Sequence, residues 1–394
     1  MKFSLLDDTF PAETRRNVGV VTLARLTANA CFRFAPPFLA SISDDLHVSL
    51  GRLGVALMVT EIAGGVASLA GSLVDRISRR TAMVVGLSTL SAGTAIAAAS
   101  RSVVVFAIGI VVLGIAKMMF DMGLAGWVND HVDYDRRGRV VGITETSWAL
   151  GLLVGVSGMG LVASVSSWRW GYAAGALSVA VMAIVVAVRA HNPDHAHAPL
   201  IRTPSARMRP DGLLVIASMF FLMASSQSLF VTFGSWLDDD FSFSDARIAA
   251  VVFGLGAFEL LASVTSARRS DVWGKERSTV FGALLIVPSG LLLAVLHDNL
   301  AAGLVLLGIY LLGFEFAIVS MIPIATNMIP GSPGKGLGLT YTGGMLARAS
   351  MSFAATAAYD HWGIEAPALM GAASALGLIA TMTVYSRIRA GAPL

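Results

Sequence analysis

The sequence is short of charge and of cysteine. Charged residues make up 13% of its 394 residues, about half the share found in an ordinary soluble domain. This scarcity excludes a polar, water-facing surface over most of the chain. The one cysteine, Cys31, excludes a disulfide framework within the chain. Neither a soluble fold nor a disulfide-stabilised one is expected.

The first residues lack the pattern of a cleavable signal peptide. Asp7, Asp8 and Glu13 lie there beside Arg15 and Arg16, and no small-residue cleavage pattern follows the first apolar run. We therefore expect the first apolar segment to be retained as a membrane span.

Clusters of catalytic or metal-ligating side chains are also missing. Three of the seven histidines, His191, His195 and His197, share one polar stretch with Asp194, which a solvated linker explains better than a metal site. No pore loop or repeated filter indicates a channel. The sequence predicts no catalytic residue, no metal and no cofactor. A membrane enzyme is the main alternative from another class.

Apolar residues, in contrast, are abundant. They make up 55% of the chain, and the mean hydropathy is +0.73. A bilayer core needs roughly 20 apolar residues for each helical crossing. The sequence predicts an all-α polytopic membrane protein with twelve spans, at residues 17–42, 51–74, 81–99, 102–128, 140–163, 169–189, 211–236, 246–267, 278–296, 299–327, 336–359 and 365–388.

The placement of basic residues indicates the orientation of these spans. Most of the 28 lysines and arginines fall in loops on one side of the predicted membrane, and short loops rich in Lys and Arg stay in the cytoplasm. Only four fall in the opposite loops, namely Arg52, Arg101, Arg169 and Arg247. We expect a multi-pass inner-membrane protein with both termini cytoplasmic and the loop 238–240 outside.

The chain is predicted to consist of two tandem six-helix halves. Residues 1–189 and 211–394 each hold six spans, and the proline-containing stretch 190–210 links them. Gly138–Thr146 (GRVVGITET) resembles Gly334–Thr342 (GKGLGLTYT) at the equivalent place in the second half. Because six spans separate the two copies, the halves are expected to be parallel repeats with a binding site at their interface.

One loop resembles the signature of a known family. The stretch Gly71–Arg80 (GSLVDRISRR) is similar to the major facilitator superfamily pattern Gly-x-x-x-Asp-Arg/Lys-x-Gly-Arg/Lys-Arg/Lys, with Ser78 in place of the second glycine. Ala267–Arg277 (ARRSDVWGKER) is a weaker second copy, and Ser167–Tyr172 (SWRWGY) resembles a common entry into span 6. The resemblance implies this superfamily's fold and transport by alternating access.

The resemblance also implies a cytoplasmic gate in these loops. An aspartate near a helix end can meet arginines and helix termini of the opposite half when that side closes. The alternative is that the arginines only fix the topology. The gate residues expected are Asp75, Arg76, Arg79, Arg80, Asp271, Lys275 and Arg277.

Charged residues inside the predicted spans need a reason, because each costs about 2.5–3.5 kcal/mol at a helix centre. Depth counting along straight helices pairs Arg25 with Asp121, Arg33 with Glu61, and Glu315 with Arg348, while Lys117 can pair with Asp121 one turn away. We expect a substrate cavity lined by Arg25, Asn29, Arg33, Glu61, Lys117, Asp121, Trp148, Gln227, Glu315 and Arg348.

The acids in these spans outnumber the bases. Glu61, Asp121, Glu145, Glu259 and Glu315 face only Arg25, Arg33, Lys117 and Arg348. A carboxylate without a base can bind and release a proton. Glu145 is the leading candidate for proton coupling, followed by Asp121 and Glu259. The alternative for Glu145 is a structural hydrogen bond to a neighbouring helix backbone.

The spans say less about the cargo and its direction. Arginines present a two-pronged donor to carboxylates, which favours an anionic ligand unless protein acids neutralise them. Gly151–Gly160 (GLLVGVSGMG) partly matches the glycines of an exporter motif but lacks its proline, and close helix packing is the favoured explanation of these small residues. The predicted function is proton-coupled secondary transport of a small organic molecule, with efflux of an anionic or amphiphilic compound favoured. A lipid or glycolipid flippase and an uptake symporter are the alternatives.

The expected partners follow from this function. They are a small-molecule substrate, protons and the lipid bilayer, with no nucleic acid, and the chain is expected to be a monomer.

Overall fold

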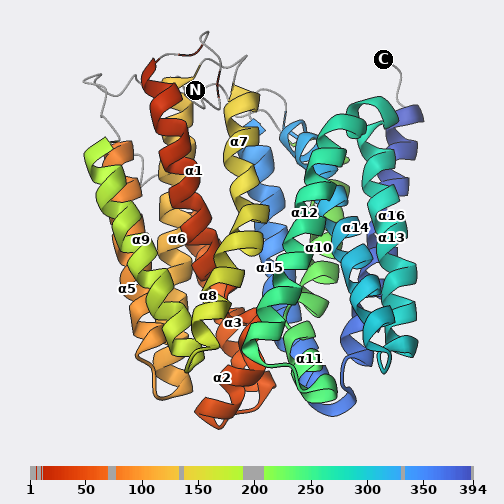
Figure 1. The fold of residues 1–394 in the computed structure, drawn as a ribbon. Coiled ribbons are helices and arrows are strands. Elements are labelled where there is room, and N and C mark those ends of the chain that lie inside the picture. Colours follow the sequence, from red (N-terminus) through yellow and green to blue (C-terminus); the bar gives the residue numbers. More distant parts are fainter. Residues whose placement is uncertain are drawn as a thin grey trace. The chain divides into compact units, whose positions relative to one another are not determined.

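The computed structural model describes residues 6, 10, 12–69, 77–132, 137–189, 208–329 and 333–391. All regular secondary structure within these ranges is helical (Figure 1). Every predicted span coincides with one or more helices of the described residues, so the all-α membrane fold is confirmed.

Nine helical segments of the described residues are long and apolar enough to cross a membrane. They are Arg79–Ala98, Val103–Val128, Val140–Ala163, Trp168–Arg189, Gly212–Phe241, Asp245–Ser270, Lys275–Leu296, Leu300–Thr326 and Glu365–Arg389. The other three predicted spans coincide with α1, α3 and α15, which carry Arg25, Glu61 and Arg348.

Contacts group the chain into two compact units. Unit 1 comprises Met1–His47, Ala63–Asp194 and Ser244–Gly256, and unit 2 comprises Val48–Ile62, His195–Phe243 and Ala257–Leu394. Each unit therefore includes a short segment that the six-and-six division assigns to the other half. The division at 1–189, 190–210 and 211–394 stays a prediction about how the chain is built from repeats.

The helices that begin in the first half of the chain are α1 (Ala12–Arg33), η1 (Pro36–Phe38), α2 (Leu39–Leu46), α3 (Leu50–Leu69), α5 (Arg79–Ala98), α6 (Val103–His131), α7 (Arg137–Leu150), η3 (Gly151–Val156), α8 (Ser157–Ala163) and α9 (Trp168–Arg189). Within unit 1, α5 packs against α6 and α9, and α1 packs against α7, η3 and α9. These neighbours bring the polar side chains of α1 against α6 and α7.

The helices of the second half are α10 (Gly212–Phe230), α11 (Phe233–Phe241), α12 (Asp245–Trp273), α13 (Lys275–Leu296), α14 (Leu300–Thr326), α15 (Pro333–Trp362) and α16 (Glu365–Gly391). Within unit 2, α10 packs against α15 and α16, and α13 packs against α14 and α16. The first part of α3 also belongs to this unit and approaches α15 closely. A Cβ atom on Gly54 would lie 1.9 Å from Thr356 Oγ1, so this crossing requires glycine.

Three predicted spans are interrupted. The first, expected at 17–42, ends its α-helix at Arg33 and continues through a 3₁₀ turn that contains Pro36 and Pro37, because proline lacks the N–H that an α-helix needs. The seventh, expected at 211–236, is divided into α10 and α11. The fifth contains a π-helical turn, η3, between α7 and α8, and such turns are common at functional sites.

Candidate functional site

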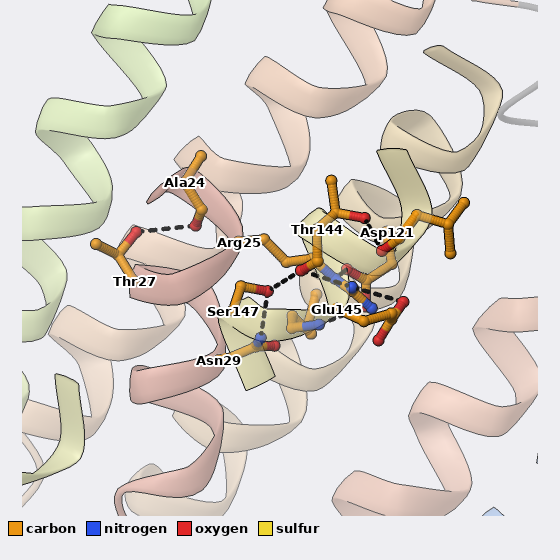
Figure 2. Close-up of polar contacts among 10 residues, drawn as sticks. Ala24, Arg25, Thr27, Asn29, Asp121, Thr144, Glu145 and Ser147 are labelled. Carbon is orange, nitrogen blue, oxygen red and sulfur yellow. Dashed lines mark hydrogen bonds and ion pairs between the residues drawn. The ribbon is translucent and has the colours of Figure 1, made fainter. Parts of the chain in front are cut away.

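In unit 1, Arg25 connects two carboxylates from different helices. Its Nη1 lies 2.7 Å from Glu145 Oε1 on α7, and its Nε donates to Asp121 Oδ1 on α6 at 3.3 Å. Nη1 also donates to the carbonyl oxygen of Thr144 at 3.2 Å. Figure 2 shows the guanidinium of Arg25 lying between these acceptors. The predicted pairing of Arg25 with Asp121 is confirmed.

Asp121 has a second base on its own helix. Lys117 Nζ donates to Asp121 Oδ2 across one turn of α6, and the Lys117 side chain is 3% exposed. Asp121 thus lies between two cations, whereas Glu145 contacts the shared guanidinium and has a side chain that is 43% exposed. The two acids share their bases unequally, and Glu145 is the one more accessible to solvent.

Three polar side chains of α1 form a stripe that faces α7. Arg25, Asn29 and Arg33 are spaced one turn apart and face one side of the helix. Asn29 Nδ2 donates to Ser147 Oγ at 3.2 Å (Figure 2). Arg33 Nη1 donates to the carbonyl oxygen of Trp148 at 3.0 Å, and its guanidinium carbon lies 4.5 Å from the centre of the Trp148 ring. The stripe therefore joins α1 to α7 rather than to lipid.

The π-helical turn η3 begins just after this contact region. A Cβ atom on Gly151 would lie 2.9 Å from Asn29 Cβ, and one on Gly155 would lie 2.4 Å from Ala30 Cβ. The two glycines thus let α1 approach the turn closely. The close-packing interpretation of this glycine pattern is supported here, although the pattern alone does not reveal the π geometry.

In unit 2, the structure forms an ion pair that differs from prediction. Arg348 on α15 donates from Nε and Nη2 to Glu61 Oε1 on α3, at 2.9 and 2.6 Å. The side chains are 14% and 7% exposed. The predicted pairs, Arg33 with Glu61 and Glu315 with Arg348, were wrong. Helix rotation and neighbour identity decide the partner, and depth counting includes neither.

Glu315 and Gln227, two further predicted residues of unit 2, have hydroxyl partners. Ser263 Oγ on α12 donates to Glu315 Oε1 on α14, and Gln227 Nε2 on α10 donates to Ser352 Oγ on α15 at 2.8 Å. Glu259 on α12 is 1% exposed. Ser263 and Ser352 were missed, because a serine in an apolar helix gives no sequence signal of which acid or amide it will meet.

Tyr310 and Ser225 form a further polar contact that the sequence did not indicate. The two hydroxyl oxygens are 2.8 Å apart, and Tyr310 Oη donates to the Ser225 carbonyl oxygen at 2.9 Å. Both residues are fully buried. The contact ties α10 to α14 beside Gln227.

The described part of the predicted gate makes contacts within unit 1. Ser78 caps the N-terminus of α5, since its side chain accepts from the Thr81 N–H. Arg79 Nε lies 3.1 Å from Asp130 Oδ2 on α6, and Arg80 donates to the Ala187 carbonyl oxygen on α9. Serine in place of the expected glycine thus has a capping role.

The structure describes few contacts for the remaining residues of the predicted gate. Asp75, Arg76 and the side chain of Asp271 lie outside the described residues. Lys275 and Arg277 lie in the first turn of α13. The gating role of the whole set stays a prediction.

The described residues contain no group of three or more His, Cys, Asp or Glu side chains that could hold a metal ion. His191, His195 and His197 lie outside the described part of the chain.

A bundle of membrane helices with ion pairs buried among its spans defines a class of protein, the polytopic carriers. The chain belongs to the Major Facilitator Superfamily, whose family model matches residues 21–350. It is therefore a membrane-spanning secondary transporter, and its family and fold are not those of enzymes.

Two relatives illustrate the sequence similarity. The chain is 25% identical to Multidrug resistance protein 1 of Bacillus subtilis over 341 residues, covering 82% of this chain and 85% of that protein. It is 30% identical over 138 residues to the uncharacterized MFS-type transporter YwfA of the same organism. The second match spans 34% of this chain and about a third, 32%, of YwfA.

Solved structures show the same fold. A bacterial homologue of the human lysosomal transporter Spinster, crystallised inward-facing and unoccupied, superposes with a TM-score of 0.77 at 12% identity, covering 95% of this chain and 98% of that one. The human organic anion transporter MFSD10 (TETRAN) superposes with a TM-score of 0.70 at 19% identity, covering 94% and 100%. At these identities the likeness concerns the fold alone.

Proposed function

We propose that this transporter moves a small organic anion or anionic amphiphile across the cell membrane by alternating access, coupled to protons at Glu145. The observation that carries the proposal is the sharing of Arg25 between Asp121 and Glu145. Both termini are placed in the cytoplasm on the distribution of Lys and Arg.

The chemistry of the shared arginine links the proton to the anion. While Glu145 is ionised, it occupies one prong of the Arg25 guanidinium. A proton on Glu145 removes that negative charge and leaves Arg25 able to bind another carboxylate, a ligand whose geometry its fork matches. Proton binding and anion binding then favour each other at one site.

The balance of charge supports an anionic cargo. Within unit 1, three bases, Arg25, Arg33 and Lys117, lie in the interior of the predicted spans with two acids, Asp121 and Glu145. The names of similar proteins are compatible with this, since one is called an organic anion transporter and another a multidrug resistance protein. Because a bound proton and a bound anion favour each other, the two would cross together, so an inward proton gradient would drive uptake. The uptake symporter that the sequence left open is therefore the proposed direction.

Replacing Glu145 by glutamine tests the coupling. Glutamine can still accept a hydrogen bond from Arg25 but cannot carry a proton. In proteoliposomes with an imposed pH gradient, Glu145→Gln should lose gradient-driven accumulation of carboxyfluorescein while retaining exchange of this probe between the two sides. Gradients of both signs reveal the direction.

Three controls accompany this test. Glu365→Gln makes the same chemical change at a carboxylate that is 55% exposed and bonded to His297 in unit 2, so it should leave accumulation unchanged. Ethidium and a fluorescent phospholipid test a cationic and a lipid cargo. Full gradient-driven accumulation by Glu145→Gln would remove Glu145 from the coupling mechanism.

A further inference from the structure

A groove runs along the surface of unit 1 between α5 and α9. Its volume is about 320 Å³. Small side chains dominate its walls, which are formed by Val84, Ser88, Ser91, Ala180, Ala183, Ile184 and Ala187. Ser88 is exposed and the Ile184 side chain is 65% exposed, so the groove opens to the surroundings of the helices. Both helices are long and apolar enough to span a membrane, and those surroundings are therefore lipid.

The groove follows the helix axes and has a defined end. On α5, residues 80, 84, 88 and 91 are spaced by three or four positions and so share one face of the helix. Arg80 thus lies one turn before the first groove residue of α5, and it donates to the carbonyl oxygen of Ala187, the last groove residue of α9. At the opposite end, Ser91 Oγ donates to the Ala176 carbonyl oxygen at 2.8 Å.

Positive charge gathers at the Arg80 end. Arg189 occupies the last turn of α9 and is exposed. The neighbouring Arg79 is neutralised by Asp130, whereas the contact formed by Arg80 is to a carbonyl oxygen. An apolar groove that opens to lipid and ends at two arginines matches an acyl chain joined to an anionic headgroup. Arginine near the membrane surface attracts anionic lipid headgroups.

We propose that this groove is a binding site for one anionic glycerophospholipid, with an acyl chain between α5 and α9 and the phosphate at Arg80 and Arg189. The site is separate from the network around Arg25 and does not depend on the proposed cargo or on proton coupling. Within unit 1, the lipid would fill the space that the small side chains leave between the two helices.

Native mass spectrometry of the full-length protein with dioleoylphosphatidylglycerol or dioleoylphosphatidylcholine tests the site. The wild type should retain one phosphatidylglycerol at concentrations about 25-fold below those needed for phosphatidylcholine, as expected for two arginines near the headgroup, each contributing about fivefold. Ser88→Leu fills the groove and should lose this retention. Ser178→Leu is the matched control, because Ser178 is exposed on α9 but does not line the groove.

A second pair of variants distinguishes binding of the lipid's acyl chain from binding of its headgroup. Ala180→Leu fills the groove from α9 and should act like Ser88→Leu. Arg80→Gln should retain lipid but reduce the preference for phosphatidylglycerol about fivefold, the effect of one arginine. Equal retention by Ser88→Leu and Ser178→Leu would overturn the proposal, as would equal binding of the two lipids by the wild type. A dimer lost in Ser88→Leu would overturn it too, by making a second copy the occupant.

Discussion

Replacing Arg25 with alanine is expected to lower the initial rate of transport about a hundredfold and to destabilise the protein by about 2–3 kcal/mol. The change removes the base that Asp121 and Glu145 share. Asp121 keeps Lys117, but Glu145 loses its described ionic partner and the Thr144 carbonyl oxygen loses a donor. We place the cost below the range for a fully buried pair because the Glu145 side chain is 43% exposed.

Initial rates in proteoliposomes and thermal unfolding in detergent measure the two effects. Arg25→Lys keeps the positive charge but loses the two-pronged guanidinium donor. Compared with Arg25→Ala, it should therefore recover more of the stability than of the transport rate. Arg52→Ala removes an exposed arginine from α3 and should change neither. If Arg25→Ala transported at the wild-type rate, the shared arginine would have no role in the transport cycle.

Replacing Arg348 with methionine is expected to cost about 3–5 kcal/mol of stability. The substitution strands Glu61, whose side chain is 7% exposed, without the two hydrogen bonds that Arg348 donates. Methionine fills a similar volume, so the loss reports mainly on the unpaired carboxylate. The expected result is a large drop in the unfolding temperature of the purified protein.

A double-mutant cycle isolates the pair from other effects. Glu61→Gln combined with Arg348→Met should be more stable than Arg348→Met alone, because the stranded charge is gone. Ser350→Ala, at an exposed position on the same helix, should stay within about 0.5 kcal/mol of the wild type. Additive effects of the two single changes would show that the pair contributes no coupling energy.

The helical membrane fold could be predicted because its signals are local. Apolar runs of about 20 residues identify the spans. The runs at α1, α3 and α15 remain recognisable although these helices contain charged residues. The shared face of Arg25, Asn29 and Arg33 could also be predicted, since it follows from helical periodicity alone. The helices that this face contacts do not follow from periodicity, and the partner predicted for Arg33 was wrong.

The partners within the second network could not be predicted in the same way. Glu61 meets Arg348 because α3 crosses α15 at Gly54, where side-chain atoms of Thr356 leave no room for a Cβ. That crossing depends on tertiary packing, and the depth of a residue along a straight helix contains no information about packing. The π-helical turn at Gly151–Val156, which α1 approaches closely, could not be predicted either, because its sequence is equally compatible with an ordinary helix.

The lumenal pH of proteoliposomes tests the coupling of anion transport to protons most directly. The vesicles contain the wild-type protein and trapped pyranine, a fluorescent indicator of the lumenal pH. No pH gradient is imposed and no carboxyfluorescein is present. A non-fluorescent organic anion, taken from a panel of aromatic carboxylates, is then added outside. The account predicts that a transported anion shifts the lumenal pH in wild-type vesicles and that Glu145→Gln abolishes the shift. Transport of the anion with no change in lumenal pH would contradict the account.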